Sequence, residues 1–272
     1  MRRASTAADE PILRIRNLHL EFHDHGRPEV VVEDLSLTLH HGEILGIVGE
    51  SGSGKSMTAL AIAGLLNRHA LDCGGEILFD GIDLLHCGRA TLRRYQGDEI
   101  SMIFQEPMTS LDPLQRIGMQ VEEALRIHHK ELSAAERKED AIRALGAAGL
   151  AEPEQVYAMY PHELSGGMRQ RVMIAAATVS RPQILIADEP TTALDVTTQA
   201  QIIALLRRIN DEDGTAIVFI SHDLSLVRQL CHRVIVMRRG VVVETGSSDE
   251  VFLNPRHAYT QSLVDAIPKV VL

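Results

Sequence analysis

The chain has 272 residues, of which 45% are hydrophobic and 24% are charged, values typical of a globular protein with a sizeable core. Its 37 acidic residues outnumber its 27 basic ones, and the formal net charge of -10 disfavours DNA or RNA as a general partner. The three cysteines, Cys73, Cys87 and Cys231, form no CxxC pair, which argues against a disulfide framework or a thiolate metal site. The longest apolar runs fall far short of the roughly 18 to 20 residues that span a bilayer, so a membrane connection requires another protein.

Short apolar runs dominate the first part of the chain. Leu13 to Leu20 and Val30 to Leu39 are separated by the turn-forming stretch His23 to Gly26, which predicts two antiparallel strands. The compact run Glu43 to Val48 predicts a buried parallel strand, and a glycine-rich loop then opens a helix from Lys55 to Leu66. This part is therefore expected to be an α/β structure with an antiparallel sheet at its start.

Helical spacing replaces this pattern from about Gln115 to Ala148, where Ser133 is a predicted N-cap with Glu136 three residues later. The alternation of strands and helices resumes at Gln183. The elements expected around this insertion are the strand Ile100 to Phe104, the strand Ile184 to Ala187, the helix Thr197 to Asn210, the strand Ala216 to Ile220, the helix Leu224 to Leu230, and a hairpin of Val234 to Met237 with Val241 to Glu244.

A glycine-rich loop with the spacing GxxxxGK[ST] joins the predicted buried strand to its helix. Its residues are Gly49, Glu50, Ser51, Gly52, Ser53, Gly54, Lys55 and Ser56. The glycines let several backbone N–H groups point at phosphate oxygens, and the helix N-terminus favours the same anion. Lys55 can bridge the β- and γ-phosphates, and the Ser56 hydroxyl can bind Mg²⁺. The loop predicts nucleotide binding, which kinases, GTPases and motor ATPases share.

Two adjacent carboxylates, Asp188 and Glu189, end the apolar strand that begins at Ile184. An acid at the carboxyl end of such a strand lies beside the nucleotide crevice of an open α/β sheet. Asp188 would hold Mg²⁺, and Glu189 can polarise the attacking water as a general base. The alternative interpretation is a pair of solvated charges at the end of a strand.

A second candidate anion site lies upstream, in the stretch Leu164 to Arg171. The Ser165 hydroxyl and the backbone N–H groups of Gly166 and Gly167 open another predicted helix, whose N-terminus favours an anion. An ordinary capped helix with a Gly-Gly turn would have the same sequence.

From about Leu13 to Val264, the order of these motifs resembles that of the ATP-binding domains of ABC transporters. The resemblance implies an α/β fold with a P-loop NTPase (RecA-like) core, an N-terminal antiparallel β subdomain and an inserted α-helical subdomain. A single domain is expected over residues 11–265. Residues 11–105 and 180–245 would form the β and RecA-like core, 106–179 the helical signature subdomain, and 246–272 a short C-terminal helical tail.

The resemblance also assigns roles to single residues. Gln105 matches the Q-loop glutamine, which acts in catalysis and at the metal, and His222 matches the switch histidine at the γ-phosphate. Ala193 to Asp195 matches the D-loop, with Asp195 close to the nucleotide. Phe22 is the expected adenine-stacking residue, although a place in the core is an equal alternative.

ATP and Mg²⁺ are the cofactors that this resemblance implies. Two ATPs would be held in a head-to-tail pair of subunits, each between one subunit's phosphate loop and the signature, Ser165 to Gly167, of the other. The expected partners are two transmembrane permease subunits, a second ATPase subunit and, indirectly, an extracytoplasmic substrate-binding protein, with no nucleic acid. The chain would lie at the cytoplasmic face of the cell membrane as a peripheral protein.

Three stretches resemble the peptide and nickel importer branch of the family: Gln105 to Pro113, Met168, and Asn254 to Thr260. This resemblance implies import of peptides or of nickel or other metal chelates, and a second ATPase subunit that is a paralogue. In the family, the segment after Gln105 docks the permease. The transported substrate itself cannot be read from this sequence.

Two other classes of protein are considered as alternatives. A soluble ABC ATPase acting on nucleic acid or in translation usually carries paired ATPase domains or a long coiled-coil insertion, and this chain has neither. A P-loop kinase or GTPase is disfavoured by the signature loop and by the adjacent Asp188 and Glu189.

Overall fold

The computed structural model describes residues 10–24, 27–67, 70–105, 110–192 and 194–267. The chain divides into two compact units, which are described separately. Unit 1 comprises Met1–Leu92 and Ala216–Leu272, and unit 2 comprises Arg93–Thr215. The division falls within helix α2 (Arg89–Tyr95).

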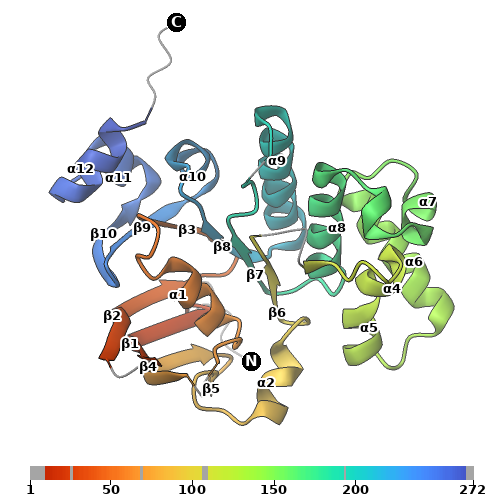
Figure 1. Cartoon of the computed structure of the whole chain (residues 1–272), viewed down its shortest axis with the longest axis horizontal. Helices are drawn as coiled ribbons and strands as arrows, with labels where there is room; N and C mark the ends of the chain where they lie inside the picture. The colour runs from red at the N-terminus through yellow and green to blue at the C-terminus, as the bar shows by residue number, and fades with distance from the viewer. Residues whose placement is uncertain (1–9, 25–26, 68–69, 106–109, 193, 268–272) are drawn as a thin grey trace, which may run out of the picture. The chain divides into compact units, whose positions relative to one another are not determined.

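Unit 1 contains a four-stranded antiparallel sheet in the order β2-β1-β4-β5 (Figure 1). Its strands are β1 (Leu13–Asp24), β2 (Arg27–Leu39), β4 (Leu71–Phe79) and β5 (Ile82–Asp83). Apolar residues pair across the sheet, with Leu13 opposite both Leu39 and Phe79 and with Ile15 opposite Ile77. All of these side chains are buried, so one face of the sheet forms part of the core.

A bulge in β1 keeps both halves of the strand directed at this core. Ile15 and Leu18 are both buried although they are three residues apart, because the register shifts between them. Within the bulge Asn17 has a φ of 48°, and its amide donates to the carboxylate of Asp34, which has a φ of 49°. One extra residue in the strand restores the alternation on the buried side.

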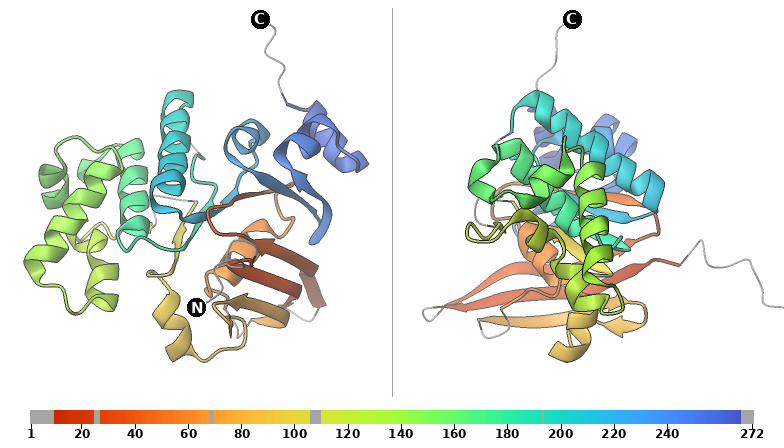
Figure 2. Two further views of the ribbon diagram at one scale, coloured as in Figure 1. Left: turned by 180° about the vertical axis from the view of Figure 1, so that it is seen from behind. Right: turned by 90° about the vertical axis from the view of Figure 1, so that its right-hand side faces the viewer.

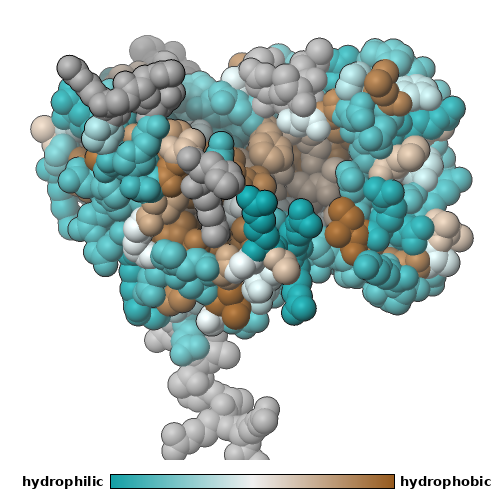
Figure 3. Space-filling model, turned by 60° about the horizontal axis from the view of Figure 1, so that its bottom comes forward, coloured by the Kyte–Doolittle hydropathy of each residue, from teal (hydrophilic) through white to brown (hydrophobic). Residues whose placement is uncertain are grey.

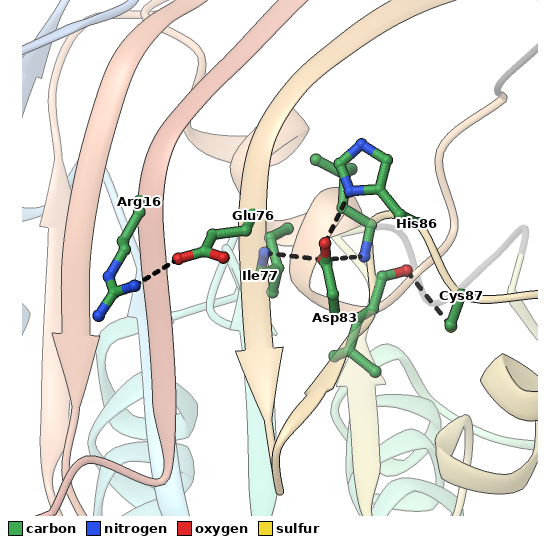
Figure 4. Close-up of polar contacts among 8 residues, drawn as sticks. Arg16, Glu76, Ile77, Asp83, His86 and Cys87 are labelled. Carbon is green, nitrogen blue, oxygen red and sulfur yellow. Dashed lines mark hydrogen bonds and ion pairs between the residues drawn. The ribbon is translucent and has the colours of Figure 1, made fainter.

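The β4–β5 hairpin is held by Asp83, which accepts a hydrogen bond from the backbone N–H of Ile77 at 3.1 Å and pairs with His86 Nδ1 at 2.7 Å (Figure 4). Burial alone would raise the pKa of Asp83, but these hydrogen bonds hold it below its usual range. Beside the hairpin, Arg16 on β1 pairs with Glu76 on β4 at 2.7 Å. The bond from Ile77 to Asp83 thus joins β5 to β4, a strand that the sequence patterns do not predict.

The other four strands of unit 1 follow the order β10-β9-β3-β8. They are β3 (Ile44–Val48), β8 (Ala216–Ile220), β9 (Arg233–Arg238) and β10 (Val241–Ser247). β3 runs parallel to β8 and β9, whereas β10 is antiparallel to β9. Every residue of β3 and β8 is buried, as expected of parallel strands covered on both faces. The loops after β3 and β8 therefore leave the same edge.

Four helices complete this part of unit 1: α1 (Lys55–Ile62), α10 (Leu224–Leu230), α11 (Ser248–Leu253) and α12 (Ala258–Asp265). α10 packs on β3 so closely that a Cβ added to Gly46 would lie 2.8 Å from Val227 Cγ1. α11 and α12 pack near β10 (Figure 1). The β9–β10 turn has positive φ angles at Arg239 and Gly240, which suits a two-residue hairpin.

Unit 2 contains the parallel strands β6 (Ile100–Ile103) and β7 (Ile184–Asp188) and mostly helices otherwise. The helices are α4 (Ile117–Val121), α5 (Glu123–His128), α6 (Ala134–Ala147), α7 (Pro153–Ala158), a 3-10 turn (Pro161–Glu163), α8 (Gly166–Thr178) and α9 (Val196–Asp213). α6 and α8 pack on each other, and α8 and α9 run side by side (Figures 1 and 2). Helices α4, α5 and α6 lie in the stretch from about Gln115 to Ala148 that the sequence predicts as a helical insertion.

The structure confirms the predicted fold class and most of the predicted elements. Ser133 caps α6 in a capping box with Glu136, as the sequence indicates. The predicted helix from Lys55 to Leu66 is too long, because Gly64 has a φ of 68° and α1 ends at Ile62. In the part of the chain that the structure describes, no helix combines the length and the apolar character needed to cross a bilayer.

Candidate functional site

The predicted phosphate loop joins β3 to α1 in unit 1. Lys55 is 6% exposed, and its Nζ donates to the backbone oxygens of Gly49 at 2.9 Å and Glu50 at 2.7 Å. Ser53 N–H donates to the same Glu50 oxygen at 3.2 Å, which closes a turn within the loop. The ammonium group is thus held inside the curl of the loop. Among the described residues, no side chain caps α1, as suits a helix N-terminus that binds an anion.

Neighbouring backbone confines this loop so closely that two of its glycines admit no side chain. A Cβ on Gly49 would lie 2.1 Å from the Met237 oxygen, and one on Gly54 would lie 2.6 Å from the Val31 oxygen. Gly54 has a φ of 96°, in the left-handed region that favours glycine. Gly240 N–H donates to the Ser53 oxygen at 3.1 Å, so the β9–β10 turn also fixes the loop. The curl therefore depends on packing against β2 and β9.

Replacing Gly54 by Ala is expected to lower the stability of the chain, because both the left-handed backbone and the contact with Val31 oppose a Cβ. We expect a loss of about 2 to 4 kcal/mol in the free energy of unfolding, measured by urea denaturation without nucleotide. The matched control is Gly81→Ala in the β4–β5 turn, where φ is 74° and a Cβ would meet nothing within 4 Å. It carries the backbone strain alone, so equal losses in both variants would contradict the tight packing of the loop.

In unit 2, the carboxyl end of β7 carries Asp188, which is 5% exposed, and then Glu189. Glu189 has a φ of 48°, an unusual backbone conformation for a residue other than glycine. Its Oε2 accepts hydrogen bonds from Gln105 Nε2 at 3.0 Å and from Thr192 Oγ1 at 2.9 Å. Two predicted catalytic side chains, Gln105 and Glu189, are therefore in direct contact.

The predicted signature loop begins α8. Ser165 is the N-cap of this helix, and its hydroxyl accepts from Met168 N–H at 3.3 Å. Both Ser165 and Gly166 are exposed, and a Cβ on Gly166 would meet nothing within 4 Å. Gly167 is tighter, because its added Cβ would lie 3.3 Å from Thr198 Cγ2. The loop thus presents an accessible helix N-terminus.

Asp195 caps α9 beside this loop. Its carboxylate accepts from Thr198 N–H at 2.9 Å and from the Thr198 hydroxyl at 2.7 Å, and these bonds lower the pKa of Asp195. Thr198 therefore links the predicted D-loop to Gly167. Ala193, which the sequence places in the same D-loop, lies outside the described residues.

The remaining predicted residues lie in unit 1. His222 is exposed and follows the carboxyl end of β8. Phe22 lies on β1 opposite Glu29 and Leu71 and is half-buried, which suits either of its two predicted roles. Loop residues Glu50, Ser51, Gly52 and Ser56 are exposed, whereas Ser53, Gly54 and Lys55 are buried.

Three side chains at this site were not predicted: Thr192, Thr198 and Tyr259. Thr192 follows the two carboxylates by only a few residues, so its position was a usable signal. Tyr259 accepts a hydrogen bond from Glu50 N–H at 2.9 Å across 209 positions of sequence. Only its place within the Asn254 to Thr260 segment could have drawn notice to it.

The residues predicted to bind Mg²⁺ carry the kind of donor atom that this ion prefers. It takes oxygen ligands, and the Ser56 hydroxyl in unit 1 and the Gln105 amide and Asp188 carboxylate in unit 2 each supply one. The Asp188 carboxylate is 5% exposed, and a cation beside it would offset part of the cost of burying its charge. Within the described ranges, no group of three or more His, Cys, Asp or Glu residues could hold another metal ion.

Comparison with known proteins gives the family. The sequence profile of the ABC transporter family matches residues 32–192, a span that contains the phosphate loop, the signature and both carboxylates. The chain belongs to this family. It is accordingly an ATP-binding, ATP-hydrolysing component of a transport system. The comparisons lend no support to an ATPase of translation or nucleic-acid metabolism.

Two curated relatives illustrate the similarity. The peptidoglycan transport ATP-binding protein YejF of Agrobacterium fabrum is 49% identical over 261 residues, which are 96% of this chain and 48% of that protein. The dipeptide transport ATP-binding protein DppD of Lactococcus lactis is 46% identical over 263 residues, 97% of this chain and 75% of that protein. The chain thus spans about half of the first relative and three quarters of the second.

The fold also resembles that of solved ATP-binding cassettes. A dimeric cassette in a post-hydrolysis state, bound to ADP and Pi, superimposes with a TM-score of 0.78 at 31% identity, covering 87% of this chain and 98% of that one. The P-loop NTPase fold predicted from the motifs is therefore confirmed.

Proposed function

We propose that the chain is the ATP-hydrolysing subunit that powers an ABC importer for peptides. The hydrogen bond of 3.0 Å between Gln105 and Glu189 carries the catalytic part of this proposal, because it orients a carboxylate at the end of a strand. The names of the relatives, which refer to peptidoglycan and dipeptide transport, support peptides as the transported class. Nickel and other metal chelates are the alternative substrates, and the transport experiment below includes nickel.

The proposed roles combine the family resemblance with the contacts described above. The loop from Gly49 to Ser56 binds the phosphates through backbone N–H groups, and Lys55 neutralises their charge. Glu189 orients the attacking water and accepts its proton on the carboxylate, while the bond between the γ-phosphorus and its leaving oxygen breaks. Gln105 and Thr192 hold that carboxylate in position. His222 is assigned to the γ-phosphate.

Ser56, Gln105 and Asp188 would hold Mg²⁺, which when bound neutralises negative charge on the phosphate oxygens. The proposal is supported by the chemistry of the donors, since carboxylate, hydroxyl and amide oxygens all suit this ion.

The active form is proposed to be a head-to-tail pair of ATPase subunits. Ser165, Gly166 and Gly167 would complete the nucleotide site on the partner subunit, with Asp195 beside them. The exposure of Ser165 and Gly166 and the open space around Gly166 support this role. The solved cassette that resembles this chain is itself dimeric. A paralogue is proposed as the partner, and residues 11–265 as one ATPase domain with a helical subdomain over 106–179.

The permease is proposed to dock on unit 2 next to Gln105, which would place the chain at the cytoplasmic face of the cell membrane. Three hydrophobic side chains just before and after Gln105 in the sequence are exposed: Phe104 is 40% exposed, Leu114 85% and Met119 58%. On the face that Figure 3 shows, most hydrophobic residues lie singly or in small groups among hydrophilic ones. Residues 106–109, which the sequence also assigns to docking, lie outside the described residues. A substrate-binding protein would act through the permease.

Reconstitution of the chain with its permease subunits, its paralogue and its binding protein in proteoliposomes tests the whole proposal. We expect uptake of labelled di- and oligopeptides that requires internal ATP and Mg²⁺ and that stops when EDTA removes the ion. Labelled nickel is the parallel substrate. ATP-driven uptake of nickel without peptide would contradict peptide import, and RNA- or DNA-dependent ATPase activity of the purified chain would contradict the transport role.

A further inference from the structure

The C-terminal segment reaches the phosphate loop through Tyr259. This residue lies on α12, is 5% exposed, and accepts on its hydroxyl oxygen the backbone N–H of Glu50 at 2.9 Å. The Arg238 guanidinium lies over the Tyr259 ring, 4.8 Å from its centroid. Burial raises the pKa of the Tyr259 hydroxyl, so the group stays protonated at neutral pH. The contact is therefore a part-buried hydrogen bond between a nearly buried tyrosine and the phosphate loop.

Hydrogen bonds fix the backbone both before and after Tyr259. Glu244 on β10 accepts the backbone N–H groups of Arg256 at 2.8 Å and His257 at 3.0 Å, which fixes the turn before α12. His257 Nδ1 accepts the backbone N–H of Tyr259 at 3.1 Å, and the Ser262 hydroxyl donates to the backbone carbonyl oxygen of Tyr259 at 2.7 Å. Burial would raise the pKa of Glu244, but the hydrogen bonds it accepts keep it below its usual range. These hydrogen bonds attach the segment that carries Tyr259 to β10 of unit 1.

The backbone of Glu50 connects this segment to the phosphate-binding lysine. Its N–H group donates to Tyr259, and its carbonyl oxygen accepts from Lys55 Nζ at 2.7 Å and from Ser53 N–H at 3.2 Å. A rotation of the backbone at Glu50 would move both the closing turn of the loop and the ammonium group. The Tyr259 hydroxyl resists such a rotation without lying at the phosphates itself.

We propose that Tyr259 is a positioning residue of the nucleotide site, and that α12 sets the affinity for ATP by fixing the backbone at Glu50. This inference rests on the proposed role of the loop in binding phosphate. It extends the site beyond residues 32–192, the part that the family profile covers. It also gives the Asn254 to Thr260 segment a physical role within the ATPase.

The test is the variant Tyr259→Phe in the full-length chain, which removes the hydroxyl and keeps the ring under Arg238. Binding of a fluorescent ADP analogue with Mg²⁺ is expected to weaken about 3- to 10-fold, the effect of one net hydrogen bond. The rate of hydrolysis at saturating ATP is expected to change less than about twofold, because Tyr259 does not touch the reacting atoms. A loss confined to affinity is a result that general destabilisation does not produce.

The matched control is Tyr157→Phe in unit 2. The Tyr157 hydroxyl is likewise hydrogen-bonded, in this case as the donor to the Glu122 carboxylate, and we expect the loss of this bond to leave the phosphate loop unchanged. Glu244→Gln is a second variant, which loosens the turn before α12 while Tyr259 stays intact. We expect it to weaken binding about 2- to 5-fold.

The outcomes distinguish a failure of the proposed function from a failure of the proposed role of Tyr259. If the wild-type chain binds no nucleotide, the proposed function fails. If the wild type binds but Tyr259→Phe and Glu244→Gln bind equally well, the role of Tyr259 is wrong. Equal weakening by Tyr157→Phe would show a general effect on folding and would overturn the inference in the same way.

Discussion

Replacing Glu189 by Gln is expected to slow ATP hydrolysis at least ~100-fold, the usual contribution of a general base, while nucleotide affinity stays within about twofold. The amide has nearly the same shape as the carboxylate but does not accept a proton from water. In the wild type, Gln105 and Thr192 both donate to Glu189 Oε2. Phosphate release by the purified chain, beside binding of a fluorescent ATP analogue, measures the two effects separately.

Glu99→Gln is the matched control in the same unit. The Glu99 carboxylate also accepts from a glutamine amide, Gln183 Nε2, at 2.7 Å, but it precedes β6 and belongs to no predicted site. It should hydrolyse ATP at nearly the wild-type rate. Normal hydrolysis by Glu189→Gln would remove Glu189 from its assigned role, and an equal loss in Glu99→Gln would indicate a structural effect of the amide.

The buried parallel strands could be predicted from the sequence because their signal is local. β3 and β8 consist wholly of buried residues, and a compact β-branched run followed by a glycine loop indicates such a strand without any knowledge of its neighbours. The β9–β10 hairpin was predicted for a similar reason, since Arg239 and Gly240 form its turn. In these segments the local pattern and the tertiary environment agree.

β4 was not predicted, because its own residues hardly favour a strand. Gly74 and Gly75 interrupt it, and Leu71, Ile77 and Phe79 are its only buried residues. It forms because β1 pairs with it along most of its length. Gly75, with a φ of 87°, fits against Asn17 in the bulge of β1, where an added Cβ would lie 2.4 Å from the Asn17 oxygen. That requirement is visible only once the two strands are paired.

In the candidate site, too, some features could be predicted from the sequence and others could not. The phosphate loop, Asp188 and the Ser165 turn are contiguous motifs, so the sequence indicates them directly. The contact of Gly167 with Thr198 and the bond from Glu50 to Tyr259 join segments that are far apart in the chain. No periodicity or spacing encodes such contacts, so only the structure shows which side chains hold each motif in place. The catalytic roles themselves stay predictions until the variants are measured.

Replacing Gly166 by Asp is expected to abolish hydrolysis, by at least ~100-fold, without weakening the fold or the binding of nucleotide to the phosphate loop. A Cβ at Gly166 meets nothing within 4 Å, and an acidic residue suits the first turn of α8, which has none. The harm arises only if an anion must approach this helix N-terminus, because a carboxylate would repel it. Gly88→Asp is the control, at an exposed glycine with equally open surroundings that precedes α2.

Mixing this variant with Lys55→Met decides whether the two loops act across a pair of subunits. Gly166→Asp keeps an intact phosphate loop, and Lys55→Met keeps an intact signature. In the absence of the paralogue, the experiment uses pairs formed by two copies of this chain, and a head-to-tail pair of the two variants then has one complete composite site. Equal amounts should recover up to about a quarter of the wild-type phosphate release, since about half of the pairs are mixed and each has one intact site of two. If both variants are inactive alone and the mixture stays inactive while mixed pairs form, the composite site is wrong, because a complete pair of loops would then be present without activity.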